Sequence, residues 1–417
     1  MSTTNTAVYS SLVSETGVAA LLSDDPIIAC MDKSTEKDFE QKTYQSGDTV
    51  YVRLEDQPQM AVQSNVMNMD PVIQREVAVT ALIYNNGVPL PSVEYEYFLG
   101  GKARVQKNIL KPRMKGMAAT AYGICYASIA KCMNYFGTAG TDLTSGTLWA
   151  PGKAILTNQL ALPSEGLYGI MSEDTMSACA ADLAKYFQPS KDVATAYLEG
   201  VVKEAMGLNF FSTSLIPNHA NGTAVGSGTT GFAVGTNVTT GATTIAASGG
   251  TSAGTLTEGS LIWFSGAAQY AVQPQTKKNL STKRYFCVDS LLTLSGGAGT
   301  ITVTAAIYGP ENPKLQNISA LPTTASYIGI VGTASHTYEQ AIVMRKGAAG
   351  FVNLRLPDLF NFETSRSEIE GIEICSTIFA DGTNRLNMVR WDGLWGALRR
   401  QELHIARAFT RDLGSNL

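Results

Sequence analysis

The chain has 417 residues, with 31 Lys and Arg against 35 Asp and Glu, so its formal net charge is −4. Charged residues make up 16% of the chain, against about 25% in a typical soluble domain, whereas hydrophobic residues stand at an ordinary 44%. This composition excludes a disordered chain and a basic nucleic-acid-binding protein, because a mildly acidic chain has no positive field to attract phosphate. Neutral polar side chains or other protein subunits must therefore cover much of the surface, and the length predicts two or three domains.

The N-terminus and the cysteines bear on the compartment. Residues 1–17 (MSTTNTAVYSSLVSETG) contain no basic n-region, so we expect no secretory signal, and the apolar stretch between Lys115 and Lys131 is too short for a membrane span. No two cysteines form a CxxC pair, and their apolar surroundings predict buried free thiols in a reducing compartment rather than a zinc site. The six cysteines are Cys30, Cys125, Cys132, Cys179, Cys287 and Cys375.

The first elements in chain order are a short helix and a long hairpin. Residues 23–26 (SDDP) are typical of a helix cap, which predicts a short helix through Cys30. Residues 47–54 (GDTVYVRL) and 75–84 (REVAVTALIY) alternate like strands, with residues 55–74 as an extended tip rich in Gln, Asn and Met. Such a ribbon has little core of its own, so it must pack on its own domain or on a neighbouring subunit. Taken alone, these residues favour packing of the ribbon on its own domain.

The clearest helix is predicted over residues 112–135. Apolar residues recur there at steps of three and four, as on one buried helical face. This stripe consists of Met114, Met117, Ala121, Cys125, Ser128, Cys132 and Phe136. We interpret the helix as a structural spine rather than a cofactor-binding element.

Mixed elements surround a β-rich segment in the rest of the chain. Helices are predicted over residues 173–187 and 192–205, and residues 338–353 could form a helix with a Gly-containing break. Residues 369–379 alternate like a strand, and the short aromatic segment 388–395 is expected to be buried. Residues 138–146 form a turn-rich break, and residues 160–171 could be either strand or helix.

Between residues 223 and 310 the chain is rich in Thr and Gly, and short strands separated by Gly-rich turns predict an inserted small all-β barrel or sandwich. The expected strands are residues 243–247, 260–265, 270–272, 284–294 and 300–308. The Gly-rich stretches 226–235 and 296–299 are interpreted as turns rather than phosphate-binding loops.

No catalytic signature stands out. The sequence lacks the GxxxxGK[ST] and HExxH patterns, and the histidines His219, His336 and His404 are isolated. The local carboxylate pairs, Asp24 with Asp25 and Glu94 with Glu96, are typical of solvated surface. We therefore expect no catalytic residue, no metal and no cofactor.

Four arginines lie near the C-terminus. They are Arg399, Arg400, Arg407 and Arg411. Nearby Asp392, Glu402 and Asp412 offset much of their charge, so we expect a solvated or interface face rather than a nucleic-acid-binding patch.

Five stretches, collinear over nearly the whole chain, resemble the major capsid proteins of tailed bacteriophages, in the group like the phage P22 coat protein. Residues 267–288 (AAQYAVQPQTKKNLSTKRYFCV) carry the most specific similarity, to a run inside that group's inserted domain. The other stretches are residues 47–54, 207–222 (GLNFFSTSLIPNHANG), 335–356 (SHTYEQAIVMRKGAAGFVNLRL) and 389–407 (VRWDGLWGALRRQELHIAR). Trp395 stands where the family more often has Tyr, and residues 72–105 are only loosely similar.

The resemblance implies an α+β chain with the HK97-type phage capsid fold and a small inserted β-barrel. Its implied parts are an N-terminal arm (1–46), an extended loop with peripheral strands (47–104), a spine helix (105–137), a first axial part (138–222), the barrel (223–325) and a second axial part (326–417).

The resemblance also implies how the chain would assemble. Hexamers and pentamers of the chain would form a virion shell in the bacterial cytoplasm, with a scaffolding protein, a portal and a possible decoration protein, enclosing DNA without sequence-specific binding and without a membrane. Residues 36–42 of the arm would reach another subunit, and the hairpin would lie on a neighbour. The expected intersubunit contact residues are Arg53, Met60, Gln63, Met67, Met69 and Arg75.

Three other functions stay open. An encapsulin-like compartment protein shares the capsid fold, but the β-rich insertion argues against it. A β-rich adhesin or carbohydrate-binding protein would fit residues 223–310 but not the spine helix. A hydrolase would need a pocket with perturbed titratable groups.

Overall fold

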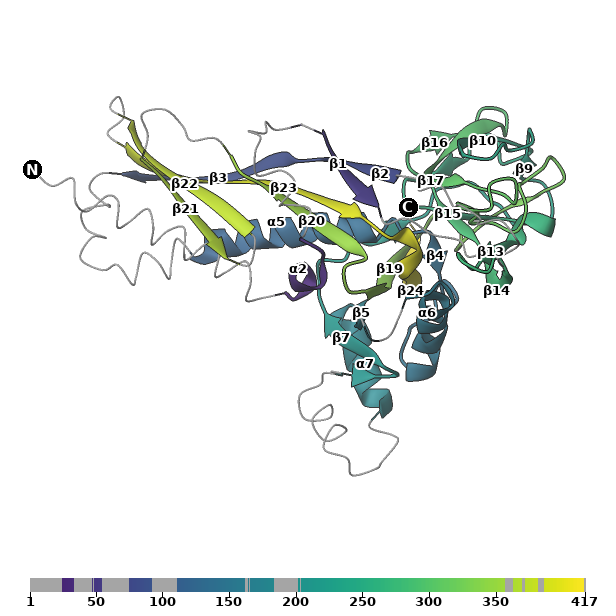
Figure 1. Cartoon of the computed structure of the whole chain (residues 1–417), viewed down its shortest axis with the longest axis horizontal. Helices are drawn as coiled ribbons and strands as arrows, with labels where there is room; N and C mark the ends of the chain where they lie inside the picture. The colour runs from purple at the N-terminus through teal and green to yellow at the C-terminus, as the bar shows by residue number, and fades with distance from the viewer. Residues whose placement is uncertain are drawn as a thin grey trace, which may run out of the picture. The chain divides into compact units, whose positions relative to one another are not determined.

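A computed structural model describes most of the chain and divides it into two units, which we treat separately. The described residues are 25–33, 47, 49–54, 75–91, 111–161, 164, 166–183, 202, 204–356, 363–369, 372–381 and 386–415. The first unit comprises Met1–Arg53, Glu76–Tyr126 and Ala349–Arg400, and the second comprises Leu54–Arg75, Ala127–Ala348 and Gln401–Leu417. Strands outnumber helices in the described residues, so the chain is α+β with mostly strands (Figure 1).

The main sheet of the first unit is built around its longest strand, β23 (Leu386–Arg399). Antiparallel neighbours pair with it along its length: β3 (Leu82–Pro91), β20 (Ala349–Leu354) and β22 (Ile372–Asp381), and β22 in turn pairs with β21 (Glu363–Ile369). Trp391 and Trp395 on β23 are fully buried. The strand predicted over residues 369–379 is confirmed from Ile372 onward as β22, whereas Ile369 belongs to β21. The segment 388–395, which was expected to be buried, lies on β23, and its residues 391–395 are buried.

The predicted hairpin is present at its base. Strands β1 (Thr49–Leu54) and β2 (Arg75–Thr80) form a two-stranded sheet, and alternate residues of β1 are buried, as its sequence pattern predicted. The strand predicted to continue to residue 84 ends at Thr80, and the chain then joins the main sheet as β3. The base packs within its own unit, on a cluster of Val50, Val52, Val79, Ala81, Val352, Leu354, Leu394 and Leu398. The tip, residues 55–74, lies outside the described residues.

Helix α5 (Lys111–Ile129) is the predicted spine, with Pro112 in its first turn, where a missing N–H costs nothing. Met114, Met117, Ala121 and Cys125 of the predicted stripe are buried. The prediction extended the helix too far, because residues 134–135 form strand β4 (Asn134–Tyr135). The short helix predicted through Cys30 is α2 (Ile27–Cys30), whose first amide donates to Asp25 Oδ1.

The second unit contains a seven-stranded sheet. Its strands run in the order β4, β24 (Ile405–Ser415), β19 (His336–Arg345), β5 (Leu167–Met171), β7 (Leu208–Ser212) and β6 (Glu204–Ala205), with β8 (His219–Ala220) also on β19. The helix predicted over residues 338–353 is wrong, since β19 and β20 occupy that range. Residues 340–344 of β19 are all buried between neighbouring strands. A run buried on both faces has no alternation, so its periodicity does not distinguish strand from helix.

Helices α6 (Gly146–Asn158) and α7 (Glu173–Leu183) belong to the second unit. Helix α7 confirms the start of the helix predicted at residue 173. The helix predicted to end at residue 205 is wrong at its end, because Glu204 and Ala205 form β6, and residues 192–201 lie outside the described residues. Helix α6 was not predicted, because Gly146, Pro151 and Gly152 weaken its local signal. Packing stabilises it instead: the Trp149 ring lies 5.1 Å from that of Phe210.

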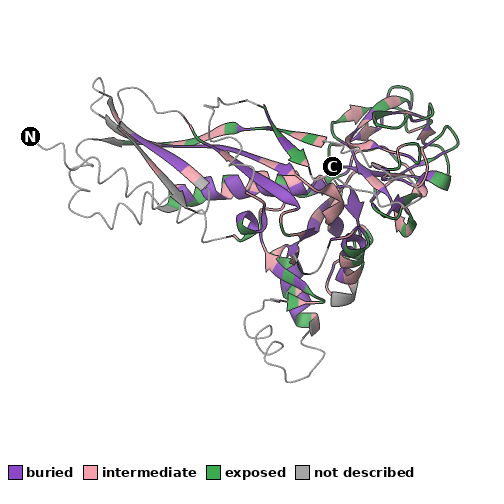
Figure 2. Ribbon diagram, in the orientation of Figure 1, coloured by how far each residue is buried: buried purple, intermediate pink, exposed green. Residues whose placement is uncertain are grey.

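Residues 223–331, called the insert below, form small sheets around one core. The strands are β9 (Ala233–Val234), β10 (Ala242–Ser248), β11 (Thr255–Leu256), β12 (Leu261–Phe264), β13 (Tyr270–Val272), β14 (Asn279–Lys283), β15 (Tyr285–Cys287), β16 (Leu292–Thr293), β17 (Gly299–Ile307) and β18 (Ile328–Ile330). They pair as β17-β10-β9, β11-β16, β15-β12-β18 and β13-β14, and no closed barrel is found among these described strands. The single strand predicted over residues 284–294 is two, β15 and β16. Figure 2 shows the buried residues gathered on the insert's strands, while exposed residues are frequent on its loops.

Candidate assembly surfaces

The β1–β2 ribbon has one buried and one exposed face. Val50 and Val52 point to the core, whereas Tyr51 is 61% exposed. Arg53 and Glu76 form an ion pair across the strands, with 3.7 Å between Nε and Oε1, and their side chains are 74% and 44% exposed. An exposed pair of this kind contributes at most about 1 kcal/mol, so the arginine is free to exchange its partner.

Only two of the six expected contact residues are among the residues that the structure describes. Arg53 ends the exposed face of β1, and Arg75 begins β2 and is half-buried. Met60, Gln63, Met67 and Met69, with arm residues 36–42, lie outside the described residues. The structure therefore brings the two arginines onto paired strands, and the role of all six in assembly remains a prediction.

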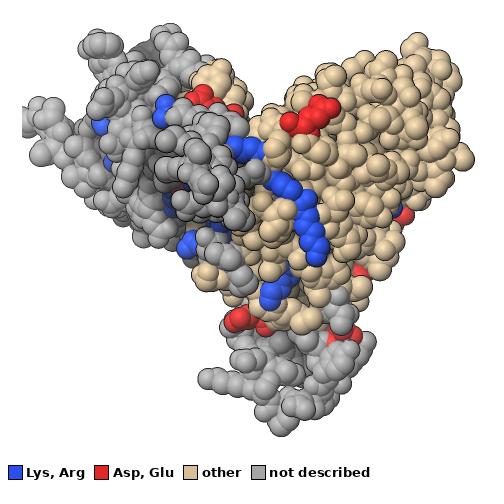
Figure 3. Space-filling view, turned by 45° about the vertical axis from the view of Figure 1, so that its right-hand side comes forward, with Lys and Arg blue, Asp and Glu red and all other residues tan. Residues whose placement is uncertain are grey.

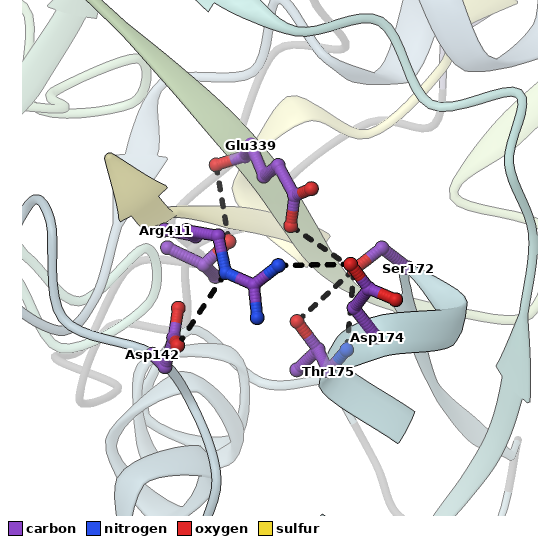
Figure 4. Close-up of polar contacts among 7 residues, drawn as sticks. Asp142, Ser172, Asp174, Thr175, Glu339 and Arg411 are labelled. Carbon is purple, nitrogen blue, oxygen red and sulfur yellow. Dashed lines mark hydrogen bonds and ion pairs between the residues drawn. The ribbon is translucent and has the colours of Figure 1, made fainter. Parts of the chain in front are cut away.

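A network around Arg411 ties the C-terminal strand to three other elements (Figure 4). Its Nη1 donates to Asp174 Oδ2 at 2.8 Å, and its Nε lies 3.7 Å from Asp142 Oδ2. Asp174 lies in the first turn of α7, where a carboxylate interacts favourably with the helix dipole. The hydrogen bond to Asp174, with the charges of Asp142 and Glu339, raises the pKa of Arg411.

Glu339 of β19 extends the network, accepting a hydrogen bond of 3.2 Å from the Ser172 hydroxyl. The carboxylates of Asp142, Asp174 and Glu339 outnumber the guanidinium of Arg411, so the network carries a net negative charge. The side chains of Arg411, Asp142 and Asp174 are 42%, 38% and 66% exposed, so solvent and salt screen their charges. The arrangement joins a loop, a helix and two strands. Sequence reasoning missed it because Arg411 and Asp174 are 237 residues apart.

The C-terminal arginines do not share one solvated face, which corrects the expectation. Arg407 is 1% exposed and therefore buried. Arg400 pairs with Asp32. The acids expected to offset these charges have other partners, since Asp392 pairs with Arg390 at 2.7 Å and Asp412 with His336 at 2.8 Å.

The described residues place few charges on the surface and form no group of side chains suited to bind a metal ion. Figure 3 shows a face on which the side chains of the described residues are mostly neither basic nor acidic, as the composition predicted. Within the described ranges, no three His, Cys, Asp or Glu side chains are grouped so as to hold a metal ion. No helix among the described residues is both long and apolar enough to cross a bilayer. The six cysteines are buried and none forms a disulfide bond, as predicted.

Comparisons with known proteins find similarity in structure only. No family model and no curated protein matches the sequence. Among solved structures, the chain is similar to "Mycobacterium phage Che8" with a TM-score of 0.43 and 7% identity, covering 92% of this chain and 90% of that one. It is also similar to "Capsid of Ralstonia phage GP4" (TM-score 0.42, 8% identity, covering 91% and 88%) and to "Crystal structure of virus-like particle from Pyrococcus furiosus" (TM-score 0.41, 6% identity, covering 96% and 99%). With TM-scores below 0.5, these similarities by themselves establish neither the family nor the function of this chain.

Proposed function

We propose that this chain is a major capsid protein with an HK97-type fold, which self-assembles into the icosahedral shell of a tailed bacteriophage around double-stranded DNA. Support for the proposal comes from the chain's own features.

The β1–β2 ribbon is the observation that carries the proposal. Its base is fixed on the core of its own unit, while Tyr51 and Arg53 face outward. The segment that joins the strands, residues 55–74, contains no Lys or Arg and includes Met60, Met67 and Met69. Methionine side chains adapt to irregular surfaces and are frequent at binding faces. A base that packs on its own core, joined to a methionine-containing tip without Lys or Arg, fits a loop that packs on a neighbouring copy.

Two further features agree with a shell subunit. The surface shown in Figure 3 is poor in charge, and interface cores are depleted in charged residues. The acidic net charge of −4 suits a container that does not adhere to packaged DNA.

The finer assignments belong to the same proposal. The chain would belong to the P22-like group, with residues 223–325 as its inserted domain and the other boundaries as expected from the sequence. It would form hexamers and pentamers with a scaffolding protein and a portal, without enzymatic activity, and reside in the virion.

Sedimentation and negative-stain microscopy of the expressed chain, alone and with the products of neighbouring genes, test the proposal. Capsomers or closed shells are expected. A protein that stays monomeric under all conditions, and binds glycans or turns over a substrate, would overturn it.

A second experiment tests the ribbon tip. Replacing Met60, Met67 and Met69 with Ser should abolish assembly and leave the circular dichroism spectrum of the monomer unchanged. The matched control replaces two apolar residues of the insert, Val225 and Leu291, which are 61% and 66% exposed, and should still assemble. Unfolding of the methionine variant would instead mean that the tip packs on its own subunit.

A further inference from the structure

The insert meets the seven-stranded sheet through two buried arginines that cross the boundary in opposite directions. Arg407 belongs to β24 of the sheet, and Arg284 immediately precedes β15 of the insert. Both are 1% exposed. Insert and sheet belong to the same unit of the chain.

Arg407 reaches from the sheet into the insert. Its Nη2 donates to the carbonyl oxygen of Gly259 at 2.6 Å and to Cys287 Sγ at 3.5 Å. Its Nη1 donates to Gln340 Oε1 on the neighbouring strand β19 at 3.2 Å, and the guanidinium lies 5.2 Å from the centre of the Phe409 ring. One planar group thus holds an insert loop and two sheet strands in a single geometry.

Arg284 makes the reverse connection. Its Nη1 donates to Asn134 Oδ1 on β4 at 3.0 Å, and its Nε donates to the Asn317 carbonyl oxygen at 2.8 Å. The Asn134 amide group donates in turn to the carbonyl oxygens of Leu403 and Ile405 at 2.9 and 3.0 Å. Burial lowers the pKa of Arg284 to about 10, with the charge of Glu402 opposing the shift.

Neither arginine is neutralised by a carboxylate at ion-pair distance within the described part of the chain. Arg407 Nε and Arg284 Nη2 are buried with no hydrogen-bond partner among the described residues. Burying a cation without a counter-ion is costly, so these residues are poor devices for stability alone. Their hydrogen bonds to carbonyl oxygens depend on where the backbone lies, and they therefore specify position.

A second set of contacts joins the insert to the sheet and its neighbouring residues. The Tyr135 ring lies 5.4 Å from Tyr285 of the insert and 5.5 Å from Phe409 of the sheet. Lys131 and Glu258 form an ion pair at the edge of the boundary. Because both arginines are buried, their hydrogen bonds lie in a region of low dielectric constant, which strengthens them.

We propose that Arg284 and Arg407 act as a reciprocal lock that fixes the orientation of the insert on the sheet and makes the two open as one cooperative unit. The lock is a property of the subunit and does not depend on the proposed shell function. Without it, the insert keeps its own core and opens independently of the sheet.

Hydrogen exchange of the full chain, followed by peptide mass spectrometry, tests the lock. In the parent protein, peptides from β12 and β15 of the insert and from β19 and β24 of the sheet should share the same highest protection. In Arg407→Met and in Arg284→Met, protection of the two regions should separate by tenfold or more. The control is Arg411→Met, which replaces a partly exposed arginine on the same strand as Arg407 and should leave the protection of the two regions matched.

A conservative variant tests the geometry of the guanidinium group. Arg407→Lys keeps the positive charge but lacks the planar, forked set of N–H donors, so the protection of the two regions should also separate in this variant. Variants that lower protection equally in both regions would show ordinary stabilisation and overturn the proposal, as would a parent protein whose two regions already differ. The parent measurement and Arg407→Lys keep the test decisive if the methionine variants do not fold.

Discussion

His219 should make the unassembled chain lose stability on mild acidification. The side chain is 5% exposed, and its ring stacks on Phe409 with 4.8 Å between centroids. The Asn221 amide nitrogen donates to the Val331 carbonyl oxygen, so Asn221 Oδ1 accepts from His219 Nε2 at 2.9 Å. Burial, and then the charge of Arg407, lowers the pKa of His219 to about 3, against the smaller raising effect of the Asn221 hydrogen bond.

Proton linkage gives the sign and the size of this change in stability with pH. The reference pKa is 6.5, so between pH 6.5 and about 3 the unfolded state binds a proton that the folded state does not. Stability therefore falls as the pH drops. From pH 7 to pH 5 this one group lowers the free energy of unfolding by about 2 kcal/mol. The figure is insensitive to the folded pKa, because at pH 5 the folded histidine is already almost fully neutral.

Urea unfolding at pH 7 and pH 5, followed by tryptophan fluorescence, measures the effect. Between pH 7 and pH 5, the free energy of unfolding should fall by about 2 kcal/mol less in His219→Phe than in the parent. Phenylalanine keeps the stacking on Phe409 and cannot titrate. The lost Asn221 hydrogen bond lowers stability at both pH values and cancels in the difference. Val343→Ala, a core truncation on the same sheet, should be less stable at both pH values but keep the parent's pH dependence. An equal pH dependence in His219→Phe and the parent would refute the reasoning.

Three other predictions concern glycines and cysteines. Gly329→Ala should destabilise the chain by about 1–3 kcal/mol in the same urea assay, because the new Cβ would lie 2.2 Å from the Trp263 ring; an unchanged midpoint would contradict this contact. Gly116→Ala should raise stability by about 1 kcal/mol, since it lies in α5 with nothing within 4 Å of the added carbon, and a loss of stability would mean that this face is covered. A thiol reagent should label none of the six cysteines in the native protein and all of them in urea, because all six are buried. Burial also raises the pKa of Cys125 and of Cys179, which leaves less of the reactive thiolate, and rapid labelling of either in the native protein would disprove its burial.

Local pattern was sufficient for several parts of the fold. The alternation of residues 49–54 predicted β1, and the apolar stripe from Met114 to Cys125 predicted the body of α5. Strands β10, β12, β13 and β17 of the insert were also predicted, because Gly-rich turns separate them, whereas β9, β11, β14 and β18 were not. For the candidate surfaces, the sequence pointed to the ribbon and to the shortage of charge, since both depend on composition and alternation.

By itself, then, the sequence determined the features that depend on neighbours along the chain: alternating strands, the start of the spine helix, free thiols and a neutral surface. Only the tertiary structure decided that residues 336–345 are a central strand, that α6 is a helix around Trp149, and that Arg407 is buried. The physical reason is distance along the chain. Burial on both faces of β19 removes its periodicity, and Arg407 meets Gly259 from 148 residues away, so no local pattern distinguishes it from the partly exposed Arg411.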